Sequence, residues 1–204
     1  MTIQEQVKEI KQSFRLMMDG AVAQSMRDKG LNYHLNWGAT LPRLREKADE
    51  IGKNYDLAIA LWKENVRECK ILATMIMPAD QMLPEVVDIW MEQMPSQEMT
   101  EQAAFNLWQH LPFAPEKAYQ WMASEKEYDQ LCGFHVLSRL FMNGQEPNER
   151  GINEYLDQVL SALQGDYPSV RKAAMQSLVR FAELGLVYER MAKSALKTIN
   201  LDFL

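Results

Sequence analysis

Apolar residues recur at helical spacing along this chain, and this periodicity limits the possible folds more than any other feature. Between residues 61 and 76 they follow at intervals of four, three, four and three, which places Trp62, Val66, Cys69, Ala73 and Ile76 on one face. The stretch LWKENVRECKILAT, residues 61–74, is therefore predicted to be a single amphipathic helix. Similar stripes are Leu131-Phe134-Leu137-Phe141, Ile152-Tyr155-Val159-Leu163 and Val170-Ala174-Leu178-Phe181. No segment alternates like a strand, so the sequence predicts an all-α fold.

Turn-forming residues separate these stripes. The predicted breaks are Asp28–Gly30, Asn36–Gly38, Gly52–Asn54, Met77–Ala79, Pro95–Ser96, Pro112–Pro115, Asn143–Pro147 and Gly165–Pro168. They leave roughly ten to twelve helices, whose pairs repeat at about 35–45 residues, the period of HEAT-like arrays. We predict an α-solenoid, a superhelix of HEAT-like antiparallel helix pairs, with a compact irregular bundle as the alternative. No low-complexity segment or long linker divides residues 1–204, so we expect one domain.

Composition limits the compartment and the chemistry. No apolar run approaches the roughly 20 residues that span a bilayer, and the polar N-terminus, MTIQEQVKEIKQSF, lacks the apolar centre of a signal peptide. Cys69 and Cys132 provide neither a disulfide framework nor metal-ligand spacing. His34 and His135 have no ligand partner at a suitable spacing. We expect a reduced, cytoplasmic protein without a metal site.

Charge is distributed unevenly along the chain, whose net charge is −6. Residues 1–70 hold 12 basic and 10 acidic side chains, residues 71–166 hold 4 and 15, and residues 167–204 hold 6 and 3. A nucleic-acid-binding domain normally carries a basic surface. The middle of this chain would repel phosphate, whereas its ends could contact a duplex.

The segment from Ser25 to Thr74 carries a family resemblance. Its matching positions are the Gly38 turn, Pro42-Arg43-Leu44-Arg45, Ala48, Leu61-Trp62, Glu68, Lys70 and Leu72-Ala73. In this order they resemble the bacterial AlkD-type DNA alkylation repair family of HEAT-like alkylpurine DNA glycosylases. Weaker similarities are Val170-Arg171-Lys172-Ala173 with Leu178 and Arg180, and Trp121 with Ser124 and Tyr128. Together these positions span most of the chain.

The resemblance implies a specific chemistry. Such an enzyme cleaves an N-glycosidic bond through an oxocarbenium-like transition state, which a carboxylate stabilises while aromatic side chains cradle the cationic base. The family assigns this work to an aspartate one turn after a tryptophan and to a second tryptophan on a late helix. Arginines on the concave surface bind phosphate, and neither a metal nor an organic cofactor takes part.

Most of these functional positions differ in this chain. The aspartate position falls on Asn106, its preceding tryptophan on Gln102 and the late tryptophan on Gln176. The arginine pair expected after Tyr128 reads Gln130-Leu131. No aspartate lies between Asp88 and Asp129, so a one-residue shift in register does not restore the carboxylate. The concave-surface candidates are Gln102, Asn106, Gln176 and Tyr128, and the phosphate-contact candidates are Arg43, Arg45, Arg171, Lys172 and Arg180.

Neighbouring residues offer no obvious replacement. Glu101 lies about 140° around the helix from Asn106. Trp108 is predicted to be a core residue, and His110 to interact with a helix C-terminus. Six methionines between Met75 and Met99 are predicted to fill the core, although exposure of several in one groove would indicate a peptide-binding surface.

Three functions remain open from the sequence. The first is a catalytically silent or divergent member of the family that binds DNA, or a protein or peptide, on its concave surface. The second is an active glycosylase that releases N3- or N7-alkylated purines. The third is a protein–protein interaction scaffold without DNA binding. Family membership alone implies an enzyme, but the residues leave enzymatic activity undecided.

Overall fold

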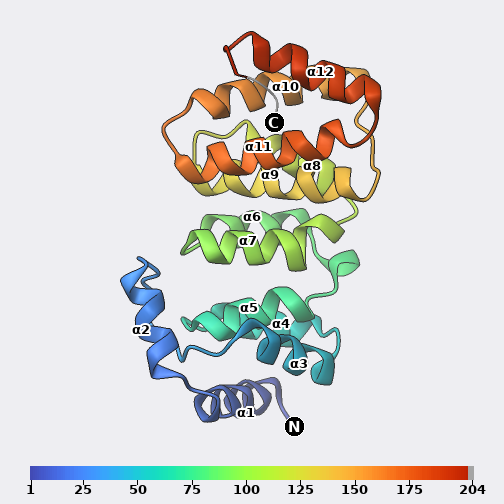
Figure 1. Ribbon diagram of the computed structural model, residues 1–204. Coiled ribbons are helices and arrows are strands. Elements are labelled where there is room, and N and C mark those ends of the chain that lie inside the picture. Colours follow the sequence, from blue (N-terminus) through green and yellow to red (C-terminus); the bar gives the residue numbers. More distant parts are fainter. Residues whose placement is uncertain (202–204) are drawn as a thin grey trace. The chain divides into compact units, whose positions relative to one another are not determined.

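A computed structural model describes residues 1–201, which form twelve α-helices and two short 3₁₀ helices (Figure 1). Within these residues the only strand-like pairing is an isolated parallel bridge between Leu35 and Val66. The all-α prediction and the predicted number of helices are therefore confirmed. The chain divides into two compact units, Met1–Leu111 and Pro112–Leu204, and the single-domain interpretation stays a prediction.

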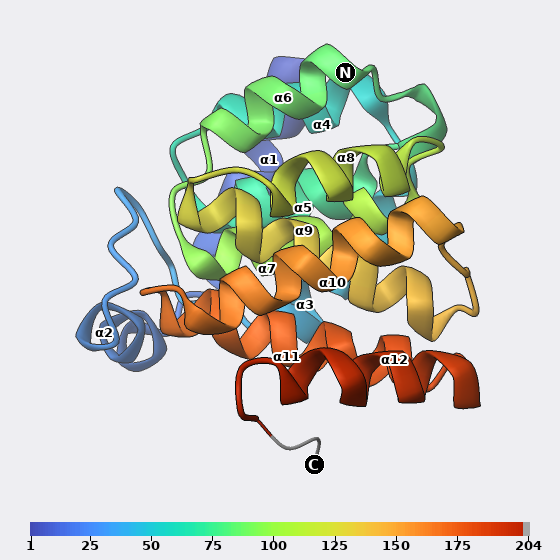
Figure 2. The same cartoon turned by 90° about the horizontal axis from the view of Figure 1, so that it is seen from above.

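The N-terminal unit is built around α5. Helices α3, α4 and α7 pack against α5, and α1 packs against α4. Helix α2 stands to one side of the other helices in this unit (Figures 1 and 2). The helices of this unit are α1 (Ile3–Leu16), α2 (Gly20–Asp28), α3 (Leu41–Ile51), α4 (Tyr55–Lys63), α5 (Arg67–Ile76), η1 (Ala79–Gln81), α6 (Pro84–Glu92), α7 (Gln97–Asn106) and η2 (Trp108–His110).

Three tryptophans pack against one another in the core of this unit. The Trp62 ring of α4 stacks on the Trp90 ring of α6 with centroids 4.1 Å apart, and Trp90 meets Trp108 edge to face at 6.1 Å. All three side chains are buried. The prediction that Trp108 is a core residue is confirmed.

In the C-terminal unit, α9 packs against both α8 and α11. Gly133 permits the close approach of α8, because a Cβ atom there would lie 2.5 Å from the backbone nitrogen of Met122. Helix α11 also packs against α10 and α12 (Figure 2). The helices of this unit are α8 (Ala114–Met122), α9 (Glu127–Met142), α10 (Glu149–Gln164), α11 (Pro168–Ala182) and α12 (Leu186–Lys197).

Local sequence signals determine where many helices begin. Thr2 and Glu5 form a capping box at α1, and side chains of Asp19, Asn54, Ser96 and Asn148 cap α2, α4, α7 and α10. Proline stands in the first turn of α3, α6, α8 and α11, where its missing N–H is not needed. The predicted breaks coincide with these helix boundaries or with the loops between them.

The prediction of one helix over residues 61–74 is wrong. Helix α4 ends at Lys63 and α5 begins at Arg67, because Val66 adopts an extended conformation and pairs with Leu35. The backbone nitrogen of Arg67 then donates to the Leu35 carbonyl at 3.0 Å. A bridge to a distant segment thus overrides the local helical periodicity.

The apolar stripes nevertheless identify the core correctly. All five predicted residues between Trp62 and Ile76 are buried, as are the predicted stripes of α9 and α11. Of the six methionines from Met75 to Met99, only Met75 is not fully buried, so they provide no exposed peptide groove. Within the described residues, no helix is long and apolar enough to cross a membrane.

Candidate functional site

Asn106 and Gln102, the two concave-surface candidates of the N-terminal unit, lie together on α7 beside α5. The Asn106 side-chain nitrogen donates to Oγ1 of Thr74 at 3.0 Å and to Oε1 of Gln102 at 3.3 Å. Thr74 is fully buried and donates its hydroxyl proton to the Ile71 carbonyl at 2.7 Å. Asn106 is half-buried at the last residue of α7. These three side chains form a cluster, here called the amide cluster, of Asn106, Gln102 and Thr74.

The amide cluster carries no formal charge. It can orient a water molecule by hydrogen bonding, but it offers no anion to stabilise a developing cation. The nearest carboxylate on α7 is Glu101, which accepts a hydrogen bond from Gln97 Nε2 at 2.8 Å. This hydrogen-bond partner lies toward the start of the helix.

The opposite end of the same helix pair holds a buried ionic cluster, which the sequence analysis did not predict. The Arg67 guanidinium binds Glu98 with two hydrogen bonds, Nη2 to Oε1 at 2.6 Å and Nε to Oε2 at 2.9 Å. Its Nη1 donates to the Ala39 carbonyl at 3.0 Å and lies 3.4 Å from Oε1 of Glu68. Arg67 is 1% exposed and Glu68 is fully buried. We call Arg67, Glu68 and Glu98 the ionic cluster.

The ionic cluster attaches the segment before α3 to the helix pair. The Glu68 carboxylate accepts hydrogen bonds from the backbone nitrogens of Trp37 and Ala39 at 3.2 Å. The Tyr33 hydroxyl donates to Glu98 at 2.7 Å and lies equally close to the Ser96 hydroxyl. Burial, and secondarily the Glu98 charge, raise the pKa of Tyr33. These contacts, together with the bridge between Leu35 and Val66, fix the backbone of the segment.

Gly38 meets a geometric requirement of the same segment. Its φ of +78° lies in the left-handed region, and a Cβ there would come within 2.3 Å of the Asp19 carbonyl oxygen. The family resemblance includes Gly38 and Glu68. No sequence signal indicated the cluster, since Arg67 and Glu68 stand among other charged residues such as Lys70 and their partners come from distant segments.

In the C-terminal unit, Gln176 lies between two cations on α11. Lys172, Gln176 and Arg180 are spaced by four residues and form one solvent-facing stripe. Arg180 also forms an ion pair of 2.6 Å with Glu183. Arg171 lies off this stripe and donates to the Gly165 carbonyl. Tyr128 is half-buried in the first turn of α9.

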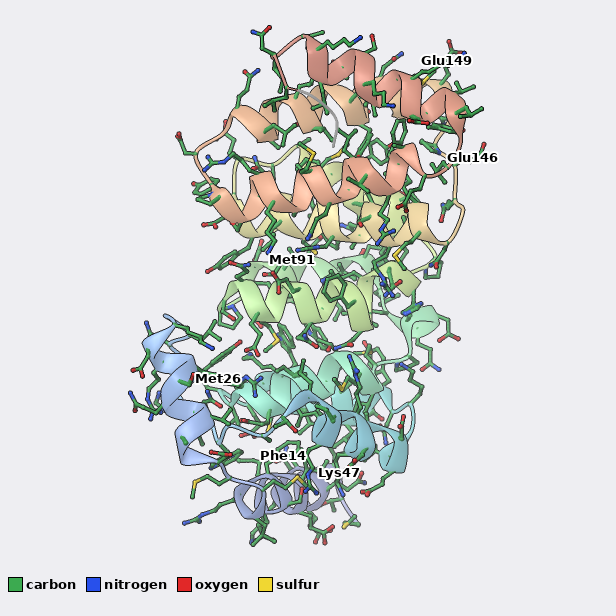
Figure 3. The ribbon with its side chains drawn as sticks, viewed as in Figure 1. Phe14, Met26, Lys47, Met91, Glu146 and Glu149 are labelled. Carbon is green, nitrogen blue, oxygen red and sulfur yellow. The ribbon has the colours of Figure 1, made fainter. Side chains whose placement is uncertain are left out.

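The remaining phosphate-contact candidates, Arg43 and Arg45, are both exposed on α3 but do not share a face. Two residues correspond to a rotation of about 200° around a helix, so their side chains leave on different sides. Lys47 shares the side of Arg43 and pairs with Glu50 at 2.8 Å (Figure 3). The phosphate-binding role of these candidates stays a prediction.

The structure brings two of the concave-surface candidates together, both in the N-terminal unit. Asn106 and Gln102 are in contact in the N-terminal unit, whereas Gln176 and Tyr128 belong to the C-terminal unit. Their convergence on one surface stays a prediction. Among the described residues, no three His, Cys, Asp or Glu side chains gather in a group that could hold a metal ion.

Comparisons with known proteins add family and fold information. The profile of the family described as "DNA alkylation repair enzyme" matches residues 10–178. A solved structure described as "a new family of proteins related to the HEAT-like repeat DNA glycosylases with affinity for branched DNA structures" matches with a TM-score of 0.83. The two are 17% identical, and the match covers 94% of this chain and 82% of the other. A comparison with curated proteins gives no significant match. The HEAT-like fold prediction is confirmed.

Proposed function

The chain belongs to the DNA alkylation repair enzyme family, and we propose that within it this protein binds DNA without cleaving N-glycosidic bonds. The observation that carries this proposal is the amide cluster. At the position where the resemblance places the catalytic aspartate, Asn106 donates hydrogen bonds through a neutral amide. An oxocarbenium-like transition state would find no negative charge there to stabilise it.

DNA binding is supported by the surface of α11. Lys172 and Arg180 flank Gln176 on one solvent-facing stripe, and lysine and arginine at this spacing can contact phosphates along a strand. The structurally similar protein, with its affinity for branched DNA, makes branched DNA the first substrate to test. The proposed role is therefore recognition of DNA structure rather than repair chemistry.

A base-release experiment tests the absence of catalysis. The protein is incubated with duplex DNA that contains N7-methylguanine or N3-methyladenine, and the free base is measured against the uncatalysed rate. We expect no excess release. Release above that rate, abolished in the Asn106→Ala variant, would show that the protein is an active glycosylase that works without the usual carboxylate.

A binding experiment tests the DNA-binding half of the proposal. Fluorescence anisotropy is measured with labelled linear duplex, three-way junction and four-way junction at low salt, where electrostatic binding is strongest. We expect binding that the Lys172→Glu/Arg180→Glu double variant weakens at least tenfold. The Arg190→Glu/Lys197→Glu variant, which reverses two exposed charges on α12, is the control for net charge. Undetectable binding to all three DNAs would favour a protein scaffold instead.

A further inference from the structure

A second basic surface lies in the N-terminal unit, beside α1. Lys8, Lys11 and Arg15 follow one another at intervals of three and four residues, so they lie on one face of this helix. They line a groove of about 280 Å³ together with Gln4, Gln12, Trp37 and Glu64. The volume is close to the lower end of the range for small-ligand sites, roughly 300 Å³.

The charges of this groove favour an anion. Lys11 pairs with Glu64, with 2.7 Å between Nζ and Oε2. Lys8 and Arg15 are exposed, and in the part of the chain that the structure describes neither forms an ion pair. Two positive charges of the groove thus remain available to a ligand, although the whole chain carries a net charge of −6.

Trp37 gives the groove an aromatic wall. The other four tryptophans are at most 4% exposed, whereas Trp37 is half-buried and borders the groove. Its ring packs against Phe14 with centroids 6.4 Å apart, and Phe14 points from α1 into the unit (Figure 3). Exposure of a single tryptophan beside a row of cations is an arrangement suited to a ligand that combines negative charge with a flat ring.

The buried ionic cluster holds this tryptophan in place. The Trp37 backbone nitrogen donates to both oxygens of the Glu68 carboxylate, at 3.2 and 3.3 Å. Its carbonyl accepts a hydrogen bond of 2.9 Å from the backbone nitrogen of Asp19. The ring is therefore presented from a fixed backbone, and binding would lose little conformational entropy on its account.

From this combination we infer that the groove beside α1 binds single-stranded DNA. Lys8 and Arg15 contact two phosphates, the amides of Gln4 and Gln12 face the backbone oxygens, and Trp37 packs against a base. Single-stranded sites combine positive charge along the backbone with aromatic rings for stacking. A paired duplex would offer the phosphates but no free base face. This inference rests on the proposed DNA-binding function and adds a site separate from the α11 stripe.

Tryptophan fluorescence isolates this site because the other tryptophans are buried. Acrylamide, a neutral quencher, is titrated into the wild-type protein with and without unlabelled dodecathymidylate. We expect part of the emission to be quenched in the free protein and protected by the oligonucleotide. The Trp37→Phe variant, which keeps a ring against Phe14, should lose that component.

Affinity for the oligonucleotide tests the cations directly. We expect the Lys8→Gln/Arg15→Gln variant to bind labelled dodecathymidylate at least tenfold more weakly, with a salt slope smaller by about 1.4, since each phosphate that is no longer neutralised lowers the slope by about 0.7. The matched control is Arg27→Gln/Lys29→Gln at the exposed end of α2, which removes the same charge from the same unit. Circular dichroism and thermal melting establish that both double variants are folded.

The outcomes separate this inference from the proposed function. If the two double variants bind equally well, or if the oligonucleotide protects no tryptophan, the groove is not the site, while duplex and junction binding stand unaffected. If the wild-type protein binds linear and branched DNA but not the oligonucleotide, the inference alone is wrong. If it binds no DNA at low salt, the proposed function itself is overturned.

Discussion

The two ends of the α5–α7 pair are joined in opposite ways. At one end Arg67 and Glu98 form a buried, doubly hydrogen-bonded ion pair, supported by Glu68. At the other end Asn106 meets Thr74 and Gln102 through neutral groups. The same two helices are thus joined by buried charges at one end and by neutral groups at the other.

This difference separates fold from chemistry. Buried charges are costly unless they are paired and hydrogen-bonded, and the ionic cluster meets that condition because each of its members has several partners. Its contacts hold the segment with Trp37 and Ala39 in place. The family resemblance places a catalytic carboxylate at the other end, where this chain has an amide. Under the proposed function, the residues that maintain the fold match the family, whereas the residue at the catalytic position does not.

The largest expected effect comes from breaking the ionic cluster. Arg67→Ala leaves the buried Glu68 carboxylate and its neighbour Glu98 without their cation, so we expect a loss of about 3–5 kcal/mol in the free energy of unfolding. Urea denaturation measures it. The control is Lys47→Ala, which removes the half-buried partner of the exposed Glu50 and should cost less than about 1 kcal/mol. Equal losses for the two variants would mean that the cluster is not what secures this end of the pair.

Placing a charge at the neutral end should have a smaller effect. Asn106→Asp replaces a donor by an acceptor opposite Oγ1 of Thr74 and Oε1 of Gln102, so we expect a loss of about 2 kcal/mol at pH 7. The pKa of the new carboxyl should be raised, because only its protonated form can donate. The penalty should therefore be absent below about pH 4, the ordinary pKa of aspartate, and grow as the pH rises through the folded-state pKa. A pH-independent loss would contradict this account.

The pH dependence of the charged end offers a third test. Burial, followed by the charge of Glu64, raises the pKa of Cys69 from 9.0 to about 12. The unfolded chain then loses this proton before the folded chain does. The protonated thiol's contribution to the free energy of unfolding is complete below about pH 9 and is lost as the pH rises toward 12.

Between pH 8 and pH 10 the Cys69→Ala variant should therefore differ from the wild-type protein in its pH slope. The wild-type protein should lose about 1.4 kcal/mol of stability relative to the variant over this range, since one pKa unit corresponds to about 1.4 kcal/mol. The sign follows from proton binding: above pH 9 the folded chain holds a proton that the unfolded chain has released, so the wild-type protein is the one that loses stability. Urea denaturation at pH 8, 9 and 10 measures the difference between the two slopes. Parallel slopes would show that this thiol does not contribute.

The same comparison shows how far sequence reasoning reaches. Helix periodicity identifies the core, because Cys69, Ala73 and Ile76 are buried wherever the helix begins. It fails at Val66, where a bridge to Leu35 interrupts the helix, since no local pattern reports pairing with a segment about thirty residues away. The ionic cluster was missed for the same reason: Arg67, Glu98 and Ala39 meet only in three dimensions. Residue type favoured an exposed position for Arg67 and Glu68, because charged residues are normally exposed.

The smallest expected effect concerns Thr74, which accepts from Asn106 and donates to the Ile71 carbonyl. Thr74→Val keeps the shape and removes the hydroxyl. Because Asn106 is half-buried, its amide can turn to water and still contact Gln102, so we expect a loss of only about 0.5–1 kcal/mol. In the Asn106→Asp background, Thr74→Val should change the stability by a different amount. The Thr74 hydroxyl can rotate there and is the nearest donor to the new carboxylate. A double-mutant cycle of positions 74 and 106 measures this coupling. Strict additivity would mean that the two side chains share no significant hydrogen bond, and the amide cluster would then not explain why this end is neutral.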